Sequence, residues 1–212
     1  MSAGQAGRPD LVAEMAALLR EAGSKPIDVA RFLDGLDHDE RVSAIRSLGR
    51  SQQQTLWNAS QGFAELALLD LVPADTPTNG AVRHYGKNTL PFFSHFEKRF
   101  SRQATANASS PSELIGFNFQ SMSPITGPGY FVAVASETAG EVVVDYRRVP
   151  TADPSQRPTD WPDVKPNDRG LSRFVYGFMV DTLRRVSEHV TIGSAAREGK
   201  DLGSWFVLCR ES

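Results

Sequence analysis

The sequence predicts an α+β protein: a helical N-terminal segment followed by an antiparallel β-sheet of five or more strands that helices cover and that can close into a barrel. Apolar residues recur at helical spacing over residues 9–71. The pattern changes over residues 112–150, where β-favouring residues form short apolar-polar runs. The strands follow one another without short alternating helices, which argues against a doubly wound nucleotide-binding fold.

Start signals divide the N-terminal segment into four helices. Pro9 and Pro26 suit the first turn of the first two helices, because proline fixes φ and lacks a donor that this turn does not need. Asp37 and Glu40 have the spacing of a capping box at the start of the third helix. The fourth helix begins near Ser51.

A break separates the helical segment from the sheet. Residues 73–80 contain two prolines and an Asn-Gly pair, which are typical of turns and linkers. We therefore expect a helical segment over residues 1–72, a linker over 73–80 and a sheet domain over 80–212.

The sheet domain contains several segments with strand character. Residues 150–170 are rich in proline and aspartate and should form an exposed connection. Residues 171–186 fit both a helix and a strand, and we favour the helix. The predicted strands, which include two hairpins, are Leu114–Phe119, Tyr130–Val134, Val142–Val149, Val190–Ile192 and Trp205–Leu208.

Residues 91–102 carry the strongest pattern in the chain. At 100° per residue, one helical face gathers the phenylalanines Phe92, Phe93, Phe96 and Phe100. A second face gathers a basic stripe of His95, Lys98, Arg99 and Arg102. The spacing predicts a basic amphipathic helix whose phenylalanines pack on the sheet.

This basic stripe has three interpretations. It can be a solvated face, an anion site for a phosphate, a carboxylate or an acidic partner, or a membrane-surface contact. The whole chain has a net charge of -2, but residues 80–111 hold five basic residues and one acidic residue, with Lys87 among the basic ones. The acidic remainder of the chain argues against nucleic acid as a partner.

Gly127 and Gly129 precede a predicted strand. Glycines at such a position allow positive φ and close approach of the backbone. They fit a tight turn, or a backbone collar around a ligand at the mouth of the sheet.

Three residues are candidates for acid-base chemistry. His84 and His189 titrate near neutral pH, and Asp145 lies within an apolar strand-like run where a carboxylate must be paired if it is buried. Asp145 suits a structural ion pair with a nearby arginine, or an acid-base pair with a histidine. A metal site would need the scattered histidines to converge, so we expect no metal and no cofactor.

These observations lead to three functional hypotheses. The first is a non-enzymatic protein that binds a small, largely apolar ligand with an acidic group in a cavity between sheet and helices. The second is a small metal-independent enzyme, an isomerase, cyclase or hydrolase, that uses a histidine with Asp145. The third is a protein-interaction module that binds its partner through the N-terminal helices.

The expected location is the cytoplasm of the cell. Cys209 is the single cysteine, so no intramolecular disulfide can form, which fits a reducing compartment. No apolar run approaches the roughly 20 residues that a transmembrane helix needs. We therefore expect a soluble, cytoplasmic protein with no transmembrane segment.

Overall fold

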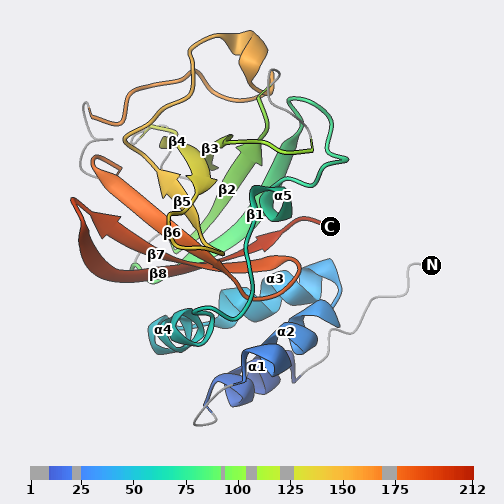
Figure 1. Ribbon diagram of the computed structural model, residues 1–212. Helices are drawn as coiled ribbons and strands as arrows, with labels where there is room; N and C mark the ends of the chain where they lie inside the picture. The colour runs from blue at the N-terminus through green and yellow to red at the C-terminus, as the bar shows by residue number, and fades with distance from the viewer. Residues whose placement is uncertain (1–9, 21–24, 92–93, 104–108, 120–126, 169–175) are drawn as a thin grey trace.

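A computed structural model describes residues 10–20, 25–91, 94–103, 109–119, 127–168 and 176–212. It shows a closed barrel of eight antiparallel strands with a layer of helices on one side (Figure 1). The helices are α1 (Leu11–Arg20), α2 (Pro26–Asp34), α3 (His38–Ser47), α4 (Arg50–Ala59) and α5 (Leu68–Leu71). The strands are β1 (Ala81–Asn88), β2 (His95–Ser101), β3 (Leu114–Phe119), β4 (Tyr130–Ala135), β5 (Val142–Asp145), β6 (Met179–Arg185), β7 (Val190–Arg197) and β8 (Lys200–Arg210).

The strands form an up-and-down barrel. Each strand pairs with the next along the chain, and β8 pairs back with β1, so the described sheet has no free edge. The α+β class with an antiparallel sheet is therefore confirmed. The predicted β4–β5 and β7–β8 hairpins are also present.

Helices α1 to α4 cover the outside of the barrel at β7, β8 and β1. Their apolar faces form one buried cluster with Val190, Ile192, Val207 and Cys209, which point outward from β7 and β8. The predicted capping box at Asp37 is present, since its side chain accepts from the backbone N–H three residues later and the glutamate there reciprocates. None of the described helices is long and apolar enough to cross a membrane.

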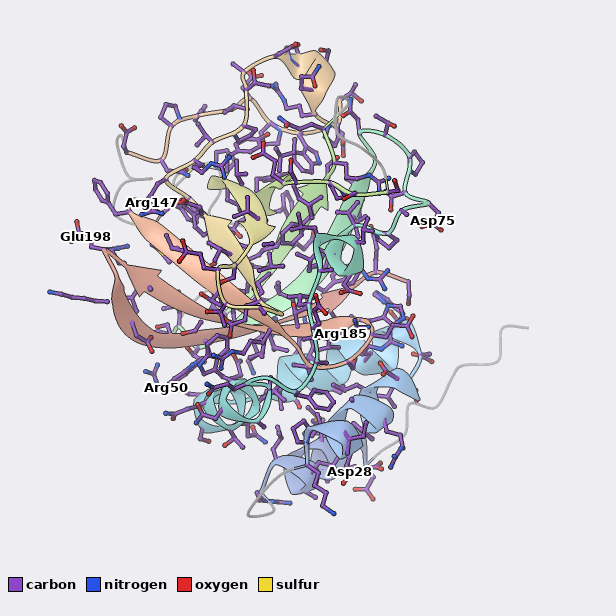
Figure 2. The ribbon with its side chains drawn as sticks, in the orientation of Figure 1. Asp28, Arg50, Asp75, Arg147, Arg185 and Glu198 are labelled. Atoms are coloured by element: carbon purple, nitrogen blue, oxygen red, sulfur yellow. The ribbon has the colours of Figure 1, made fainter. Side chains whose placement is uncertain are left out.

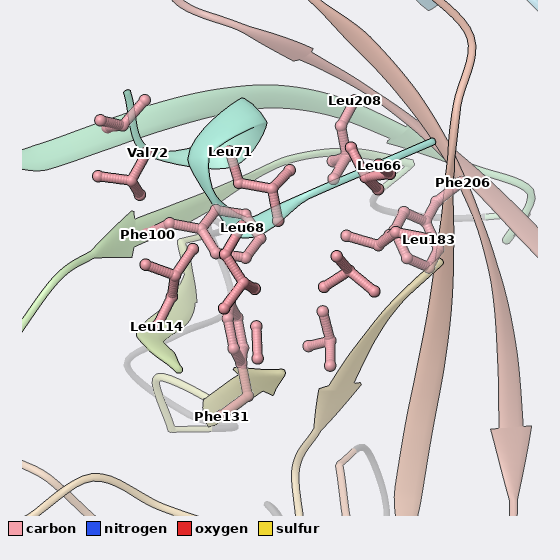
Figure 3. Packing of buried hydrophobic residues seen from close by; sticks show 14 of the residues in the cluster. Leu66, Leu68, Leu71, Val72, Phe100, Leu114, Phe131, Leu183, Phe206 and Leu208 are labelled. Atoms are coloured by element: carbon pink, nitrogen blue, oxygen red, sulfur yellow. The ribbon is translucent and has the colours of Figure 1, made fainter. Parts of the chain in front are cut away.

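The short helix α5 closes one end of the barrel. Leu68 and Leu71 pack among inward-facing side chains such as Phe100 and Phe131, as Figure 3 shows. The Nε2–H of His84 on β1 donates to the Leu71 carbonyl at 2.9 Å. The plugged end is therefore the end at which β1 begins, and the opposite end is where β1 stops at Asn88.

The helix predicted over residues 91–102 is wrong. Residues 95–101 form strand β2, which pairs with both β1 and β3. In a strand, side chains alternate between two faces, so Phe96, Lys98 and Phe100 point into the barrel while His95 and Arg99 point out. The phenylalanines at 92 and 93 lie outside the described residues.

The favoured helix over residues 171–186 is also wrong where the structure describes it. Residues 179–185 form β6, between β5 and β7. Phe178 just before this strand has a positive φ of 61°, which no helix contains. Residues 171–175 of the prediction lie outside the described residues.

Three inward-facing glycines make room for three aromatic rings inside the barrel. Each glycine lies directly across from a phenylalanine on the neighbouring strand, and the pairs are Gly86 with Phe96, Gly116 with Phe131, and Gly193 with Phe206. A Cβ on any of these glycines would come within 2.8 Å of the ring of its partner. Small residues opposite large ones thus let the rings fit into the narrow interior.

Charged side chains surround both layers of the protein. Figure 2 shows Asp28 and Arg50 on the helices, and Arg147 and Glu198 at the outside of the barrel. Among the buried charged side chains, Lys98 on β2 and Asp181 on β6 lie inside the barrel.

We expect Gly116→Ala to destabilise the fold. The new Cβ would lie 2.4 Å from the Phe131 ring and 2.5 Å from the Arg99 carbonyl oxygen. Overpacking of this kind costs about 1–3 kcal/mol. Gly35→Ala is the matched control, because φ there is -81° and its Cβ meets nothing closer than 3.4 Å. Urea unfolding that gives both variants the same stability would contradict the account of the glycine-phenylalanine pairs.

Candidate functional site: a buried lysine-aspartate pair beneath an open cavity

A cavity of about 370 Å³ occupies the end of the barrel opposite α5. Leu90 and Leu202 stand at its rim, and both are exposed apolar side chains. Tyr176 and Met179 add apolar surface to its wall. The cavity is thus largely apolar, and its exposed edge includes Leu90 in the β1–β2 connection and Leu202 on β8.

Four polar side chains form the floor of this cavity. Lys98 donates from Nζ to Asn118 Oδ1 at 3.1 Å, to Asp181 Oδ2 at 3.1 Å and to the Tyr146 hydroxyl. Tyr146 in turn donates to Asp181 Oδ2 at 3.2 Å and accepts from Asn118 Nδ2 at 2.8 Å. All four residues are buried. The ammonium therefore has three acceptors for its three N–H groups.

The ion pair at the centre of this cluster joins opposite walls of the barrel. Lys98 comes from β2 and Asp181 from β6, four strands away in a ring of eight. The rings of Phe131 and Phe206 lie 5.0 and 4.9 Å from Nζ, and that of Phe96 lies 5.9 Å away. Aromatic faces attract a cation at such distances, and these three rings are the ones that the inward glycines accommodate.

Burial changes the ionisation of the pair. It lowers the pKa of the Lys98 amine, although the charge of Asp181 opposes this shift. It also raises the pKa of the Asp181 carboxyl, which Lys98 opposes. Since the two pKa values move toward each other, transfer of a proton from Lys98 to Asp181 costs less free energy here than in water. Burial likewise raises the pKa of Tyr146, so its hydroxyl stays protonated.

One carboxyl oxygen of Asp181 has no hydrogen-bond partner among the described residues. Oδ2 receives both Lys98 and Tyr146, whereas the buried Oδ1 has no hydrogen-bond partner among the described residues. A buried acceptor without a partner costs about 1–3 kcal/mol. Asp181 lines the cavity, but protein atoms cover Oδ1, so a molecule bound there could supply the missing hydrogen bond only after the carboxyl group turns.

In the structure, the four basic side chains that the sequence predicts as an anion site lie in different places. Lys98 lies in the cavity, while Arg99 points outward onto the Phe119 ring and pairs with Glu97 at 2.8 Å. Arg102 donates to the backbone carbonyls of residues 72, 73, 74 and 76, and so fixes the chain after α5. His95 is exposed at the start of β2.

The other predicted ligand-binding residues have structural contacts. Lys87 points outward from β1 and donates to the Arg46 carbonyl at 2.7 Å, which ties the barrel to α3. Gly127 and Gly129 have φ values of 79° and 59°, which suit glycine. A Cβ on Gly129 would lie 2.5 Å from the Tyr176 ring, so this glycine gives the ring its place at the cavity wall.

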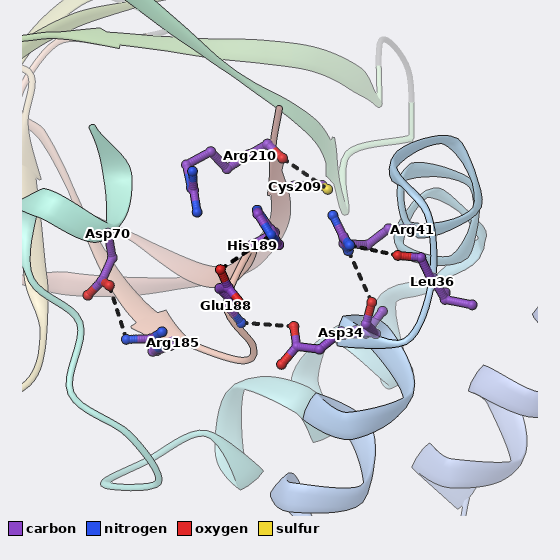
Figure 4. Close-up of polar contacts among 10 residues, drawn as sticks. Asp34, Leu36, Arg41, Asp70, Arg185, Glu188, His189, Cys209 and Arg210 are labelled. Carbon is purple, nitrogen blue, oxygen red and sulfur yellow. Dashed lines mark hydrogen bonds and ion pairs between the residues drawn. The ribbon is translucent and has the colours of Figure 1, made fainter. Parts of the chain in front are cut away.

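The three candidates for acid-base chemistry lie in different parts of the protein. His84 contacts the plug helix at the closed end of the barrel. Asp145 points outward and pairs with Arg147 at 2.9 Å, which is a structural ion pair. His189 lies between β6 and β7 beside Glu188, near Arg41 and the helical layer (Figure 4). The structure therefore does not assemble the proposed histidine-aspartate pair.

Sequence reasoning missed Asp181, Tyr146 and Asn118. Asp181 alternates with Met179 and Leu183, so a strand reading of this segment would have placed a carboxylate among inward apolar residues. Among the described residues, no three His, Cys, Asp or Glu side chains gather in a way that could hold a metal ion.

Comparisons of the chain with protein-family models, with curated proteins and with solved structures find no match. The residues and geometry of the barrel are therefore the basis for assigning a function.

We expect His84→Gln to make the free energy of unfolding fall less steeply as the pH is lowered. Burial lowers the pKa of His84 from 6.5 to about 3. The unfolded chain therefore binds a proton that the folded chain does not, and stability falls as the pH drops from about 6.5 toward 3. At about pH 4.5 this loss is roughly 2–3 kcal/mol.

Glutamine keeps an N–H for the Leu71 carbonyl and does not titrate. Urea titrations between about pH 6.5 and 4.5 should thus give the variant a shallower loss of unfolding free energy than the wild type. Equal slopes would contradict a neutral, buried His84.

We expect Asp181→Asn to lower the free energy of unfolding by about 3–5 kcal/mol, because it leaves the buried Lys98 ammonium without its counter-charge. Adding Lys98→Met should restore most of this loss. Asp163→Asn is the control, because Asp163 also has an arginine partner but its side chain is 92% exposed. Urea unfolding at neutral pH measures all three, and a double variant as unstable as the single one would contradict the explanation.

Proposed function

We propose that this protein binds one small, largely apolar molecule in the open half of its barrel. The observation that carries the proposal is the cavity of about 370 Å³ above a buried polar cluster. Sites for small molecules typically measure roughly 300–1,000 Å³, with mostly apolar walls and a few polar groups that fix orientation. Eight-stranded barrels are just wide enough to be filled by side chains or to hold one small ligand.

The floor of the cavity suggests which end of the ligand enters first. Asp181 Oδ1 has no partner among the described residues. As a carboxylate it accepts a hydrogen bond from a ligand hydroxyl or N–H, and as the neutral acid it can donate to a ligand carbonyl. The proposed ligand therefore has a polar group at one end and an apolar body that fills the space toward Leu90 and Leu202.

An acidic group on the ligand is no longer part of the proposal. It rested on a stripe of four basic side chains, of which Lys98 alone lines the cavity. Lys98 is already paired with Asp181 at 3.1 Å. A carboxylate beside this pair would place two negative charges close together in a poorly solvated site, which is unfavourable.

Filling the cavity should abolish binding. Ala195 points into the cavity from β7, beside Asp181 on β6, so Ala195→Phe would put a ring into the space of the ligand. Affinity for the neutral fluorescent probe N-phenyl-1-naphthylamine should fall at least about tenfold, which equals 1.4 kcal/mol of binding free energy. A fluorescence titration measures this change.

The matched control is Ala196→Phe. Ala196 is the next residue of the same strand, and it lies opposite Val180 on the outer face of the barrel. This variant should bind the probe like the wild type. Equal affinities in all three proteins, or no saturable binding by the wild type, would contradict the proposed site.

A further inference from the structure

The amine of Lys98 lies in surroundings that suit covalent chemistry. It is buried, it lines the floor of an apolar cavity, and a carboxyl oxygen lies 3.1 Å from it. An amine that is removed from water in an apolar pocket is a familiar way to obtain a nucleophilic lysine. A purely structural ion pair would not need the open cavity that lies above Lys98 and Asp181.

We propose that Lys98 is a nucleophile whose ε-amine forms an imine with the carbonyl carbon of a small, largely apolar aldehyde or ketone held in the cavity. This inference rests on the proposed binding function and names the chemical class of the ligand. The carbonyl is the polar end that meets the cavity floor, and the apolar body lies along the wall.

Asp181 is placed to move the protons that this reaction needs. It first takes a proton from the Lys98 ammonium, which frees the nitrogen lone pair. As the C–N bond forms and the C=O π bond breaks, the carbonyl oxygen takes that proton from Asp181. The nitrogen returns a proton to Asp181, which then protonates the hydroxyl of the carbinolamine. Water leaves as the nitrogen lone pair forms the C=N bond, and because the nitrogen still carries one hydrogen the product is the protonated imine, an iminium.

The overall step balances without any oxidant or reductant. Ammonium and carbonyl give iminium and water, so one positive charge stands beside the Asp181 carboxylate before and after the reaction. The remaining N–H of the iminium can still be donated to Asp181. The rings of Phe131 and Phe206, about 5 Å from Nζ, face a cation in both states. The site thus accommodates the product without a new buried charge.

The two carboxyl oxygens of Asp181 have different partners, which suits the proton transfers of this reaction. Oδ2 holds Lys98 and Tyr146, while Oδ1 has no partner in the described part of the chain. A small rotation of the carboxyl group would turn the covered Oδ1 toward the carbonyl oxygen of the ligand while Oδ2 stays near the nitrogen. Tyr146 holds the carboxyl group in place, because its hydroxyl donates to Oδ2.

Reductive trapping on the full chain tests the proposal. The wild-type protein is incubated with 2-naphthaldehyde and sodium cyanoborohydride, and peptide mapping by mass spectrometry locates the reduced naphthylmethyl group. Exposed Lys200 is an internal control on the same molecule. Lys98 should be labelled at least about tenfold faster than Lys200, because the cavity holds the aldehyde beside its amine and burial lowers the pKa of that amine.

A competitor separates this proposal from the binding function. The alcohol 2-naphthalenemethanol has the same apolar body but cannot form an imine. Its binding is measured by displacement of N-phenyl-1-naphthylamine, and it should block the labelling of Lys98 but not that of Lys200. Ala195→Phe should lose labelling at Lys98, and Ala196→Phe should keep it.

The outcomes are distinct. Preferential, competable labelling of Lys98 supports the imine. Binding of the alcohol with labelling confined to the exposed lysines overturns the imine and leaves the binding function standing. Failure of both the alcohol and the aldehyde to bind overturns both proposals. Because the decisive measurement uses the wild-type chain, it does not depend on how well a Lys98 variant folds.

Discussion

The salt bridge between Lys98 and Asp181 is the constraint around which the barrel interior is organised. Removing two such ions from water costs several kcal/mol each, and their attraction compensates only if the geometry is good and every donor is used. The barrel meets this condition for the ammonium of Lys98 on β2 with acceptors from three places: Asp181 on β6, Asn118 on β3 and Tyr146 just after β5. Below the pair the interior is apolar and sealed by α5. Above it the interior is open.

The position of the rings around the ammonium follows from a backbone constraint. Phe96, Phe131 and Phe206 each face a glycine directly across the ladder, and no other residue leaves space for the ring there. The same contacts that stabilise three pairs of strands therefore direct three aromatic faces toward one nitrogen. Packing and electrostatics are coupled at this level of the barrel, since a side chain at any of these glycines would displace a ring from the cation.

The sequence predicts the class of the fold, the capping box at Asp37 and two of the hairpins. It does not predict β2, the strand that carries Lys98. Residues 96, 98 and 100 are spaced for a strand, and residues 92, 93, 96 and 100 are spaced equally well for a helix. In so short a segment local pattern cannot decide between them. Pairing with β1 and β3 decides, because the two ladders satisfy the backbone groups of β2 and give Lys98 an interior partner. For the same reason the side chains of the predicted anion site are separated, because a period of two places them on opposite faces of β2.

The site itself is beyond local sequence reasoning, because its members are far apart in the chain. Lys98 and Asp181 are 83 residues apart, and closure of the barrel brings them together. The physical clue is that the interior of the barrel is not packed as stably as it could be. A barrel of this width can be packed completely with apolar side chains, and burying that additional surface would stabilise it by about 25 cal/mol per Å². Here one half is packed, while the other holds an ion pair beneath empty space, with one carboxylate oxygen lacking a partner in the described structure. Departures of this kind from the most stable packing concentrate at functional sites. We therefore propose that the function of this protein lies in the open half of the barrel, and not in the helical layer or at the dispersed basic residues.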